Sequence, residues 1–396
     1  MRILSGKLLA AMTLFALSAT ASPDEAAKAT NALAIKLLQA SEPGNAAFSP
    51  YSIQLALAMV YAGAEGDTRT QMVTALKYPT SDMAPAFGAL QTQIQSTKGK
   101  TDLVSANRLF GQSGYQFNPA YLSLVKKIFG SEMQELDFRQ PAPAAKKINA
   151  WIEDSTRKRI RDLVSRDGLR GARLVLANAI YFKASWATPF NKDRTISLPF
   201  HQADGKVIDT PTMVATEFYG LAKHADFSLV TLPYADRDLQ LIIILPEAGQ
   251  SLSSIEHKLN AGVFKEFAQL KAQKIVLFLP RFKMEPPTWS LGPTLKGFGM
   301  PSAFDSPKGS ANFNGIAPRK PDDYLYISQV LHKCFVEVNE EGTEAAAATA
   351  LVMLAGAAMP AAPPPEIHID RPFLFAIQHR PTGACLFLGR VTDPTR

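Results

Sequence analysis

The chain has 396 residues, of which 46% are hydrophobic, and its formal net charge at pH 7 is +7. This composition is typical of a soluble globular protein that can bury a large core. No internal repeat, Gly/Ser linker or break in composition divides the sequence, so we expect one domain. With only two cysteines, the chain has neither a disulfide scaffold nor a zinc site.

The N-terminus has the pattern of a secretory signal peptide. Its parts, in order, are basic Arg2 and Lys7, a hydrophobic region at 8–17, and an Ala19-Thr20-Ala21 cleavage site before Ser22. The apolar stretch is shorter than a membrane span requires, which argues against an anchor. We expect residues 1–21 to be the signal peptide, residues 22–396 to be the domain, and the protein to be secreted or periplasmic. The sequence lacks an Asn-x-Ser/Thr acceptor, which favours a bacterial source.

Helical spacing recurs along the chain. Ser49 as N-cap and Pro50 at the first helical position begin one predicted helix. Asp67 is expected to cap a second helix, which runs through Met72 and Leu76. Helical spacing also predicts helices at 118–129, 142–160 and 254–271.

Strand patterns occupy 173–186, 239–246, 274–284 and 327–338. Within the last of these, residues 330–338 alternate as in a half-buried strand. Near the C-terminus, residues 371–377 and 385–391 read as two strands joined by a turn at Pro381-Thr382-Gly383. Helices and strands do not alternate as βαβ units, so we expect an α+β fold.

An alanine-rich run, residues 340–350, separates the strand at 327–338 from the C-terminal pair. Because alanine is the best helix former, a surface helix or flexible linker is one interpretation. However, the run has no apolar stripe with which to dock a helix. It also contains Gly342 and is followed by prolines at 360, 363, 364 and 365. Small side chains would allow such a segment to enter a sheet as a new strand.

This order of strand, alanine-rich hinge, long loop and paired strands, ending in Phe387-Leu388-Gly389-Arg390-Val391, resembles the C-terminal signature of the serpins. Further motifs resemble the family's second helix (45–53 and 56–64), its central strand (176–186), and its segments at 279–282 and 312–316. The resemblance covers nearly the whole mature chain. It implies an α+β fold with a large mixed β-sheet, two smaller sheets, several helices and an exposed reactive loop at about 340–365.

The resemblance also implies suicide-type inhibition, in which a target protease cleaves the loop, forms an acyl-enzyme and is trapped when the hinge enters the large sheet. The hinge comprises Glu340, Gly342, Thr343, Glu344, Ala345, Ala346, Ala347 and Ala348. If Thr343 faces the core, strand alternation turns Ala345, Ala347, Thr349, Leu351 and Met353 inward and Glu344 outward. The charge on Glu344 then need not be buried. This pattern favours an inhibitor over a non-inhibitory carrier or storage serpin.

The cleavage site follows from two counts along the loop. The family spacing from the hinge places the bond at Gly356-Ala357, and the spacing back from Pro364-Pro365-Glu366 places it near Ala361. We therefore expect cleavage between 354 and 361, with Leu354, Gly356, Ala357 and Met359 as candidates. No charged residue lies between Ala345 and Pro365, so elastase-, subtilisin- or chymotrypsin-like serine proteases are the expected targets. Cysteine proteases are an alternative.

The resemblance assigns Ser49, Ser52, Asn178 and His332 to a polar cluster under the middle of the large sheet. It places Trp186 at the top of that sheet, where the loop first enters. A lone histidine on an apolar strand is otherwise a satisfied core residue. Cys334 and Cys385 are either small buried residues or a disulfide that ties the base of the loop to the terminal hairpin.

Signatures of enzymes are missing, including G-x-S-x-G, H-E-x-x-H, a Gly-rich phosphate loop and C-x-x-C. We expect no catalytic residues, metal or cofactor, although a hydrolase without a known motif is a competing hypothesis. Basic residues gather on the helix predicted at 142–160, namely Lys146, Lys147, Arg157, Lys158, Arg159 and Arg161. Interspersed acidic residues favour a solvated face over a polyanion site. The expected partner is a protease, with no nucleic acid or membrane, and the expected state is a monomer.

Overall fold

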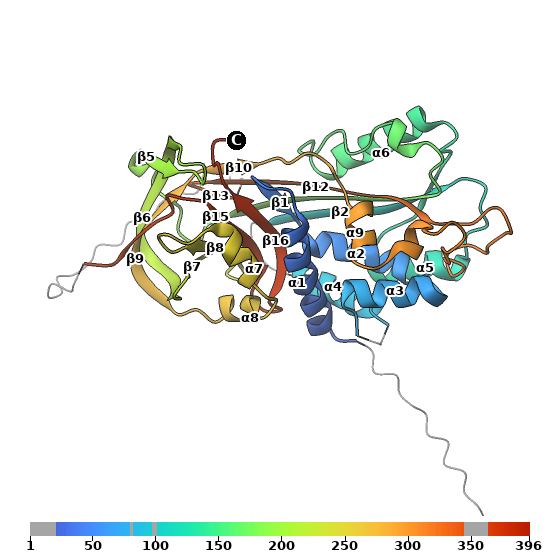
Figure 1. Ribbon diagram of the computed structural model, residues 1–396, viewed down its shortest axis with the longest axis horizontal. Helices are drawn as coiled ribbons and strands as arrows, with labels where there is room; N and C mark the ends of the chain where they lie inside the picture. Colours follow the sequence, from blue (N-terminus) through green and yellow to red (C-terminus); the bar gives the residue numbers. More distant parts are fainter. Residues whose placement is uncertain (1–20, 80–81, 97–100, 344–362) are drawn as a thin grey trace, which may run out of the picture.

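A computed structural model describes residues 21–79, 82–96, 101–343 and 363–396 of the chain (Figure 1). Their helices are α1 (Pro23–Ala40), α2 (Pro50–Tyr61), α3 (Gly66–Leu76), α4 (Ala84–Gln95), α5 (Pro119–Phe129), α6 (Pro141–Ser155), α7 (Leu252–Lys258), α8 (Val263–Phe267) and α9 (Gly292–Gly297). The predicted signal peptide up to residue 20, hinge residues 344–348 and the cleavage candidates Leu354, Gly356, Ala357 and Met359 lie outside the described residues.

One sheet has seven strands in the order β10-β12-β13-β4-β2-β3, with β11 also paired to β12. These strands are β2 (Asp102–Gln112), β3 (Gln134–Leu136), β4 (Leu174–Ser185), β10 (Phe282–Met284), β11 (Trp289–Ser290), β12 (Ile327–Asn339) and β13 (Gly342–Thr343). The sheet is mixed, because β12 runs parallel to β4 and β2 parallel to β3, whereas β2 and β4 are antiparallel.

The other sheet has nine strands in the order β1-β16-β15-β8-β7-β6-β9-β14, with β5 paired to β6. These are β1 (Ala46–Phe48), β5 (Ile196–His201), β6 (Val207–Lys223), β7 (Phe227–Pro233), β8 (Leu239–Pro246), β9 (Ala272–Pro280), β14 (Glu366–His368), β15 (Phe373–His379) and β16 (Ala384–Val391). The long strand β6 pairs with β5 and β9 over most of its length and with β7 at its end. The two smaller sheets expected from the sequence are therefore joined through β6.

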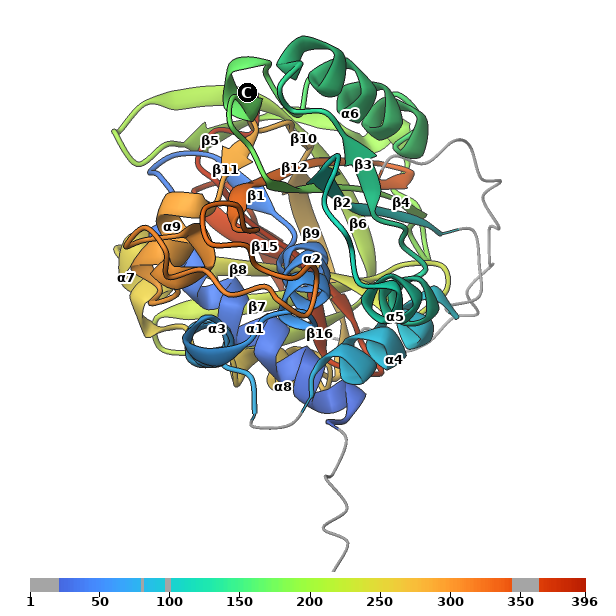
Figure 2. The ribbon, with the colours of Figure 1, turned by 90° about the vertical axis from the view of Figure 1, so that its right-hand side faces the viewer.

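Both faces of the seven-stranded sheet are covered, by α6 on one side and by the helices around α2 on the other (Figure 2). Ile148 and Ile152 of α6 share a small apolar cluster with Phe335 of β12. Val336 of the same strand belongs instead to the larger core, which extends to the nine-stranded sheet. Strand β12 is thus buried on both faces, and the prediction of a half-buried strand at 330–338 was wrong.

The start of α2 agrees with its sequence signals. Ser49 is the N-cap, its Oγ accepts the Ser52 N–H at 3.1 Å, and Pro50 is the first helical residue. The start of α3 differs from the prediction, because Glu65 rather than Asp67 occupies the N-cap and makes no side-chain cap bond. Asp67 lies in the first turn, where its charge still interacts favourably with the helix dipole.

The helix predicted at 142–160 is shorter than expected. α6 ends at Ser155, and Arg157 and Lys158 adopt left-handed backbone with φ of +51° and +63°, which no helix can continue. Only Lys146 and Lys147 of the predicted basic cluster therefore lie on α6. The prediction that all six basic residues share one helix was wrong.

Two other segments are divided. The helix predicted at 254–271 is instead α7 and α8, and Asn260 Oδ1 accepts the Gly262 N–H at 2.9 Å in the turn between them. The strand predicted at 274–284 is interrupted at Arg281, between β9 and β10. The terminal hairpin of β15 and β16 was predicted correctly.

Cys334 and Cys385 are free thiols in the core, so the disulfide left open by the sequence is not present. Burial raises the pKa of Cys334 to about 12, which keeps it a thiol. None of the helices in the described ranges is both long and apolar enough to cross a membrane.

Candidate functional site

A short strand of the predicted hinge lies between two long strands of the seven-stranded sheet. β12 and β4 pair directly with each other from Ile327 to Phe335. Beyond that point β13 separates them, with Thr343 opposite Val338 on one side and Ala184 on the other. The chain reverses direction after β12, so β13 runs antiparallel to both neighbours. The sheet is therefore already parted at one end.

Gly342 is required by this close approach. Its φ is +148°, a backbone region that favours glycine. A Cβ at this position would lie 2.0 Å from the Ala184 oxygen and 2.7 Å from the Ser185 Cα. Both atoms belong to the backbone of β4 and cannot rotate away. Any side chain at 342 would consequently push the hinge out of the sheet.

Thr343 faces the core, and an aromatic pair supports it. Its side chain is fully buried, and its Oγ1 lies 2.7 Å from the hydroxyl of Tyr234. The ring of Tyr234 stacks on Trp186 at 4.7 Å between centroids and with an interplanar angle of 9°. Trp186 in turn donates from Nε1 to the Asn339 oxygen at 2.8 Å and from its backbone N–H to the Glu341 oxygen at 3.0 Å. Trp186 and Tyr234 thus hold both sides of the hinge turn.

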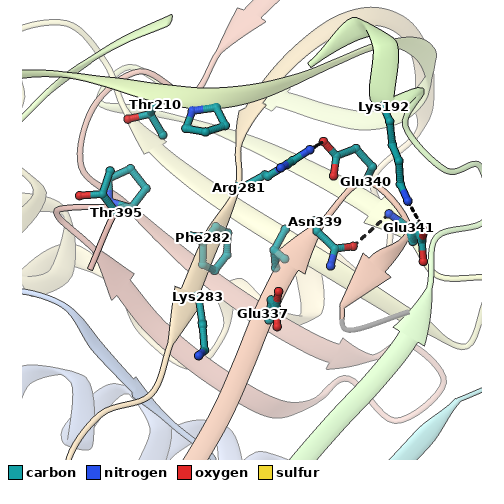
Figure 3. Close-up of a pocket in the computed structure, with 13 residues that line it drawn as sticks. Lys192, Thr210, Arg281, Phe282, Lys283, Glu337, Asn339, Glu340, Glu341 and Thr395 are labelled. Carbon is teal, nitrogen blue, oxygen red and sulfur yellow. Dashed lines mark hydrogen bonds and ion pairs between the residues drawn. The ribbon is translucent and has the colours of Figure 1, made fainter. Parts of the chain in front are cut away.

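The turn itself carries two adjacent carboxylates, and each has a cationic partner (Figure 3). Glu340 is 3% exposed and pairs with Arg281, whose Nε lies 2.6 Å from Oε1. Thr195 donates a further hydrogen bond to the same oxygen. Glu341 pairs with Lys192, Nζ to Oε1 at 2.5 Å. The two carboxylates and their cationic partners border a cavity of about 630 Å³ between the turn, β10 and the C-terminal tail.

The protonation state of Glu340 follows from the balance of two effects. Burial alone would raise the pKa of this carboxyl, but the hydrogen bonds from Arg281 and Thr195 outweigh it and lower the pKa. Glu340 is therefore a carboxylate at neutral pH. The ionic contact with Arg281 ties the end of β12 to the junction between β9 and β10.

The predicted polar cluster lies further along the same two strands. His332 and Asn178 are direct neighbours across β12 and β4, and the His332 Nδ1 contacts the Asn178 Oδ1. His332 Nε2 accepts the Ser49 backbone N–H at 3.0 Å, and Asn178 Nδ2 donates to the Ser52 Oγ at 2.6 Å. This pattern requires the His332 proton on Nδ1. The structure thus brings all four residues together and connects α2 to both strands.

The cluster has no charge. Burial lowers the pKa of His332 to about 3, so the imidazole is neutral at any physiological pH. Neutral polar groups hold neighbouring strands together through hydrogen bonds, yet they separate at lower cost than a buried ion pair. Trp186, which the resemblance places at the top of the sheet where the loop enters, is not a member of this cluster and contacts the hinge turn instead.

With this geometry established, comparison with known proteins is informative. The family model for Serpin (serine protease inhibitor) matches residues 26–394. The chain belongs to the serpin family. This serpin is 38% identical over 361 residues to an uncharacterised serpin-like protein of Thermococcus kodakarensis, with 90% of this chain and 82% of that protein covered.

Characterised relatives and solved structures agree. The leukocyte elastase inhibitor of Sus scrofa is 36% identical over 372 residues, which cover 91% of this chain and 96% of that inhibitor. The crystal structure of native protease nexin-1 with heparin superimposes with a TM-score of 0.82 at 29% identity, and covers 94% of this chain and 99% of that chain. The α+β serpin fold predicted from the sequence is therefore confirmed.

Several residues of this site were missed by sequence reasoning. They are Tyr234 and Thr195 beside the hinge, Lys192 and Arg281 as ionic partners, and Ser105 and Asn107 next to the polar cluster. Asn107 contacts Asn178, and the Ser105 hydroxyl lies 2.9 Å from that of Ser52. Ser105 and Asn107, two positions apart in β2, are only a weak signal, because the same strand also contains Asp102, Arg108 and Gln112. Tyr234 carries no comparable signal, because a buried tyrosine in a strand end is ordinary.

Proposed function

We propose that this serpin is a suicide-type inhibitor that traps a protease as a covalent acyl-enzyme. Its family and its relation to a leukocyte elastase inhibitor support protease inhibition as the general activity. The observation that carries the proposed mechanism is the position of β13, because the hinge already occupies the site where a new strand would be added. The protein itself supplies no catalytic group.

The chemistry belongs to the protease. Its serine hydroxyl attacks the carbonyl carbon of the bait peptide bond, the C–N bond breaks, and the amine leaves with the hydroxyl proton. An ester then joins the protease to the new C-terminus of this chain. Hydrolysis of that ester releases active protease, so inhibition requires the hinge to enter the sheet first.

Insertion would extend β13 between β4 and β12. The paired backbone groups of these strands, from Phe335 downward, would separate and each would bond to the inserted strand instead. Because only the entry at Thr343 is already open, the direct β12–β4 pairs are the barrier that remains. Cleavage of the loop would separate residues 344 onward from the strand that follows the loop, which would leave them free to enter the sheet.

The register of β13 supports the proposal that the segment after it can be inserted into the sheet. Extending the pairing of Thr343 with Val338 and Ala184 places Thr349 opposite His332 and Asn178. A hydroxyl would therefore reach the buried polar cluster at the point where insertion separates its members. In the same register an inserted Glu344 would lie beside Lys183 of β4, on the face opposite to Thr343, where its charge would have a partner.

The bait sequence defines the proposed targets. Between Ala345 and Pro365 the chain contains no charged residue, so a protease with an acidic specificity pocket finds no Lys or Arg. Elastase-, subtilisin- or chymotrypsin-like serine proteases, cutting within 354–361, fit this sequence. A cysteine protease is the alternative, and a non-inhibitory carrier is disfavoured by the small, uncharged segment at 345–348.

The test is incubation with a panel of proteases of each class. We expect elastase-like enzymes to give complexes that survive boiling in detergent, with cleavage at Leu354, Gly356 or Met359 located by mass spectrometry of the released C-terminal peptide. Trypsin should not be trapped through this loop. Stoichiometric inhibition of trypsin with cleavage after an Arg or Lys elsewhere would contradict the proposed specificity, and turnover of peptide esters without a partner would indicate a hydrolase.

We also propose that the protein is exported, with residues 1–21 removed, and acts as a monomer without polyanion cofactor. The basic, hydrophobic and small-residue order of the N-terminus supports export. The dispersal of the basic residues after α6 supports the absence of a polyanion site, since Arg157 already pairs with Asp102 at 2.6 Å. N-terminal sequencing of the protein recovered from periplasm or medium should begin at Ser22.

A further inference from the structure

A second cavity is lined in part by Trp186, and nothing described so far uses it. It has a volume of about 430 Å³, within the range of small-molecule sites. Residues following β4, strands β6 and β7, and Leu270 before β9 surround it. We call it the Trp186 cavity.

Its lining combines apolar and polar side chains. The larger apolar ones are Trp186, Phe218, Tyr219, Leu232, Pro233 and Leu270, and the uncharged polar ones are Thr188, Thr231 and Gln240. Phe218 is 64% exposed, although a large apolar side chain is usually buried. Trp186 and Tyr219, in contrast, are 3% and 4% exposed and belong to the core. The cavity therefore offers edges of core aromatic side chains and one aromatic ring that is open to solvent, within a lining that is also polar.

Two guanidinium groups border the same cavity. Arg237 and Arg380 are both exposed, and neither has a carboxylate within ion-pair distance in the described part of the chain. The Arg380 Nη1 donates to the Arg237 backbone oxygen at 3.0 Å, which places this guanidinium beside the 234–239 turn. Glu217 is the only acid among the lining residues, all of which are described. Cationic groups thus outnumber acidic ones at the rim.

We propose that the Trp186 cavity binds a small amphipathic anion, with a ring or alkyl body against Trp186, Phe218 and Leu232 and a carboxylate or sulfonate at Arg237 and Arg380. Guanidinium groups recognise such anions through charge-assisted hydrogen bonds. Burial of the apolar body of the ligand would contribute to its affinity, and the anionic group would fix its orientation in the cavity.

The site is coupled to the hinge through Trp186. The same side chain that forms one wall of the cavity donates to the Asn339 oxygen, and its stacking partner Tyr234 bonds Thr343. A ligand seated on Trp186 therefore favours the arrangement in which β13 lies between β4 and β12. The coupling is reciprocal. The factor by which the ligand favours this arrangement of the hinge equals the factor by which this arrangement raises the affinity for the ligand.

Binding is tested with 8-anilinonaphthalene-1-sulfonate, an aromatic anion whose fluorescence rises in apolar sites, and with N-phenyl-1-naphthylamine, which lacks the sulfonate. We expect saturable one-to-one binding of the anion and weaker binding of the neutral probe. Arg237→Gln should weaken the anion by about tenfold, the loss expected for one charge-assisted hydrogen bond. Phe218→Ala should weaken both probes.

The matched control is Lys265→Gln, in a neighbouring cavity of about 580 Å³ between α1 and α8. Arg380 borders both cavities and is left unchanged for that reason. Equal affinity of Arg237→Gln, Phe218→Ala and wild type, or a loss in Lys265→Gln alone, would overturn the assignment. Non-saturable binding would do the same.

Coupling is measured by hydrogen exchange of the intact protein, without any protease. With the anion at saturation, peptides that cover 186–190 and 339–343 should exchange severalfold more slowly in wild type and not in Arg237→Gln. Slower exchange confined to β6 and β7 would refute the coupling. Since neither measurement involves a protease, this inference stands or falls separately from the proposed inhibition.

Discussion

Replacement of Thr343 by Arg perturbs the hinge at its last described residue, which lies between β4 and β12. The threonine side chain is fully buried between β4 and β12, with its hydroxyl 2.7 Å from that of Tyr234. A guanidinium at this position loses that hydrogen bond and must enter the core. Glu340, three residues earlier, is already paired with Arg281 and offers no free carboxylate.

The magnitude follows from the burial of an unpaired charge, which costs at least several kcal/mol even after relaxation. Each ~1.4 kcal/mol added to the insertion barrier slows insertion about tenfold. A cost of about 4 kcal/mol would slow it about a thousandfold, while hydrolysis of the acyl-enzyme is unaffected. The native form should change as well, because expulsion of β13 from the sheet removes the backbone contacts of Trp186 with residues 339 and 341.

The assay compares wild type, Thr343→Arg and the control Thr343→Ser, which keeps a hydroxyl for Tyr234. Denaturing gels measure the covalent complex, residual activity gives the stoichiometry, and mass spectrometry locates the cleaved bond. We expect the Arg variant to be cleaved at the same bond and to release active protease, and the Ser variant to resemble wild type. Trapping by Thr343→Arg with wild-type stoichiometry would refute hinge insertion as the inhibitory step.

Three further predictions concern stability. Cleavage of the loop within 354–361 should raise the thermal midpoint sharply through self-insertion, and an unchanged midpoint after clean cleavage would mean that no strand is added. Burial lowers the pKa of His332 from 6.5 to about 3, so on acidification the unfolded state takes up a proton before the folded state does. The contribution of the neutral, buried His332 to the free energy of unfolding is therefore fully present above pH 6.5 and falls toward pH 3 by ~1.4 kcal/mol per pH unit. Urea unfolding of His332→Gln should lack this component, and a pH dependence parallel to that of wild type would contradict it. Arg281→Ala leaves Glu340 buried without its cation and should lower the free energy of unfolding by about 1–3 kcal/mol. Lys283→Ala, on the same cavity, removes an exposed pair with Glu285 and a cation–π contact with Phe335, and should cost about 0–1 kcal/mol. Equal losses in the two variants would argue against a buried role for Glu340.

The amino-acid sequence determined what depends on near neighbours. Ser49 and Pro50 begin α2 because an N-cap and a first-turn proline act within one turn of a helix. The turn at 381–383 and its flanking alternation likewise produce the hairpin of β15 and β16. The order of motifs along the chain was enough to identify the family and, through it, the members of the His332 cluster.

The ends of helices could not be predicted in the same way, because they depend on contacts with residues far away in the sequence. α6 ends at Ser155 rather than near 160, where Arg157 turns into left-handed backbone and pairs with Asp102 of β2. Asp67 has the right side chain for an N-cap, yet Glu65 takes that position, and its N–H donates to the distant Asn312 oxygen. In both cases a partner far along the chain decides the boundary.

Only the tertiary structure decided which residues meet at the hinge. Strand alternation predicts which side chains share a face, but it carries no information about the partner strand or its register. Ser49 and His332 are 283 residues apart, and Tyr234 and Thr343 are 109 apart, so no local pattern connects them. The insertion of β13 between β4 and β12, the ion pair of Glu340 with Arg281 and the Trp186 cavity all result from pairing between distant strands, because backbone hydrogen bonds and core packing, rather than sequence neighbours, fix that register.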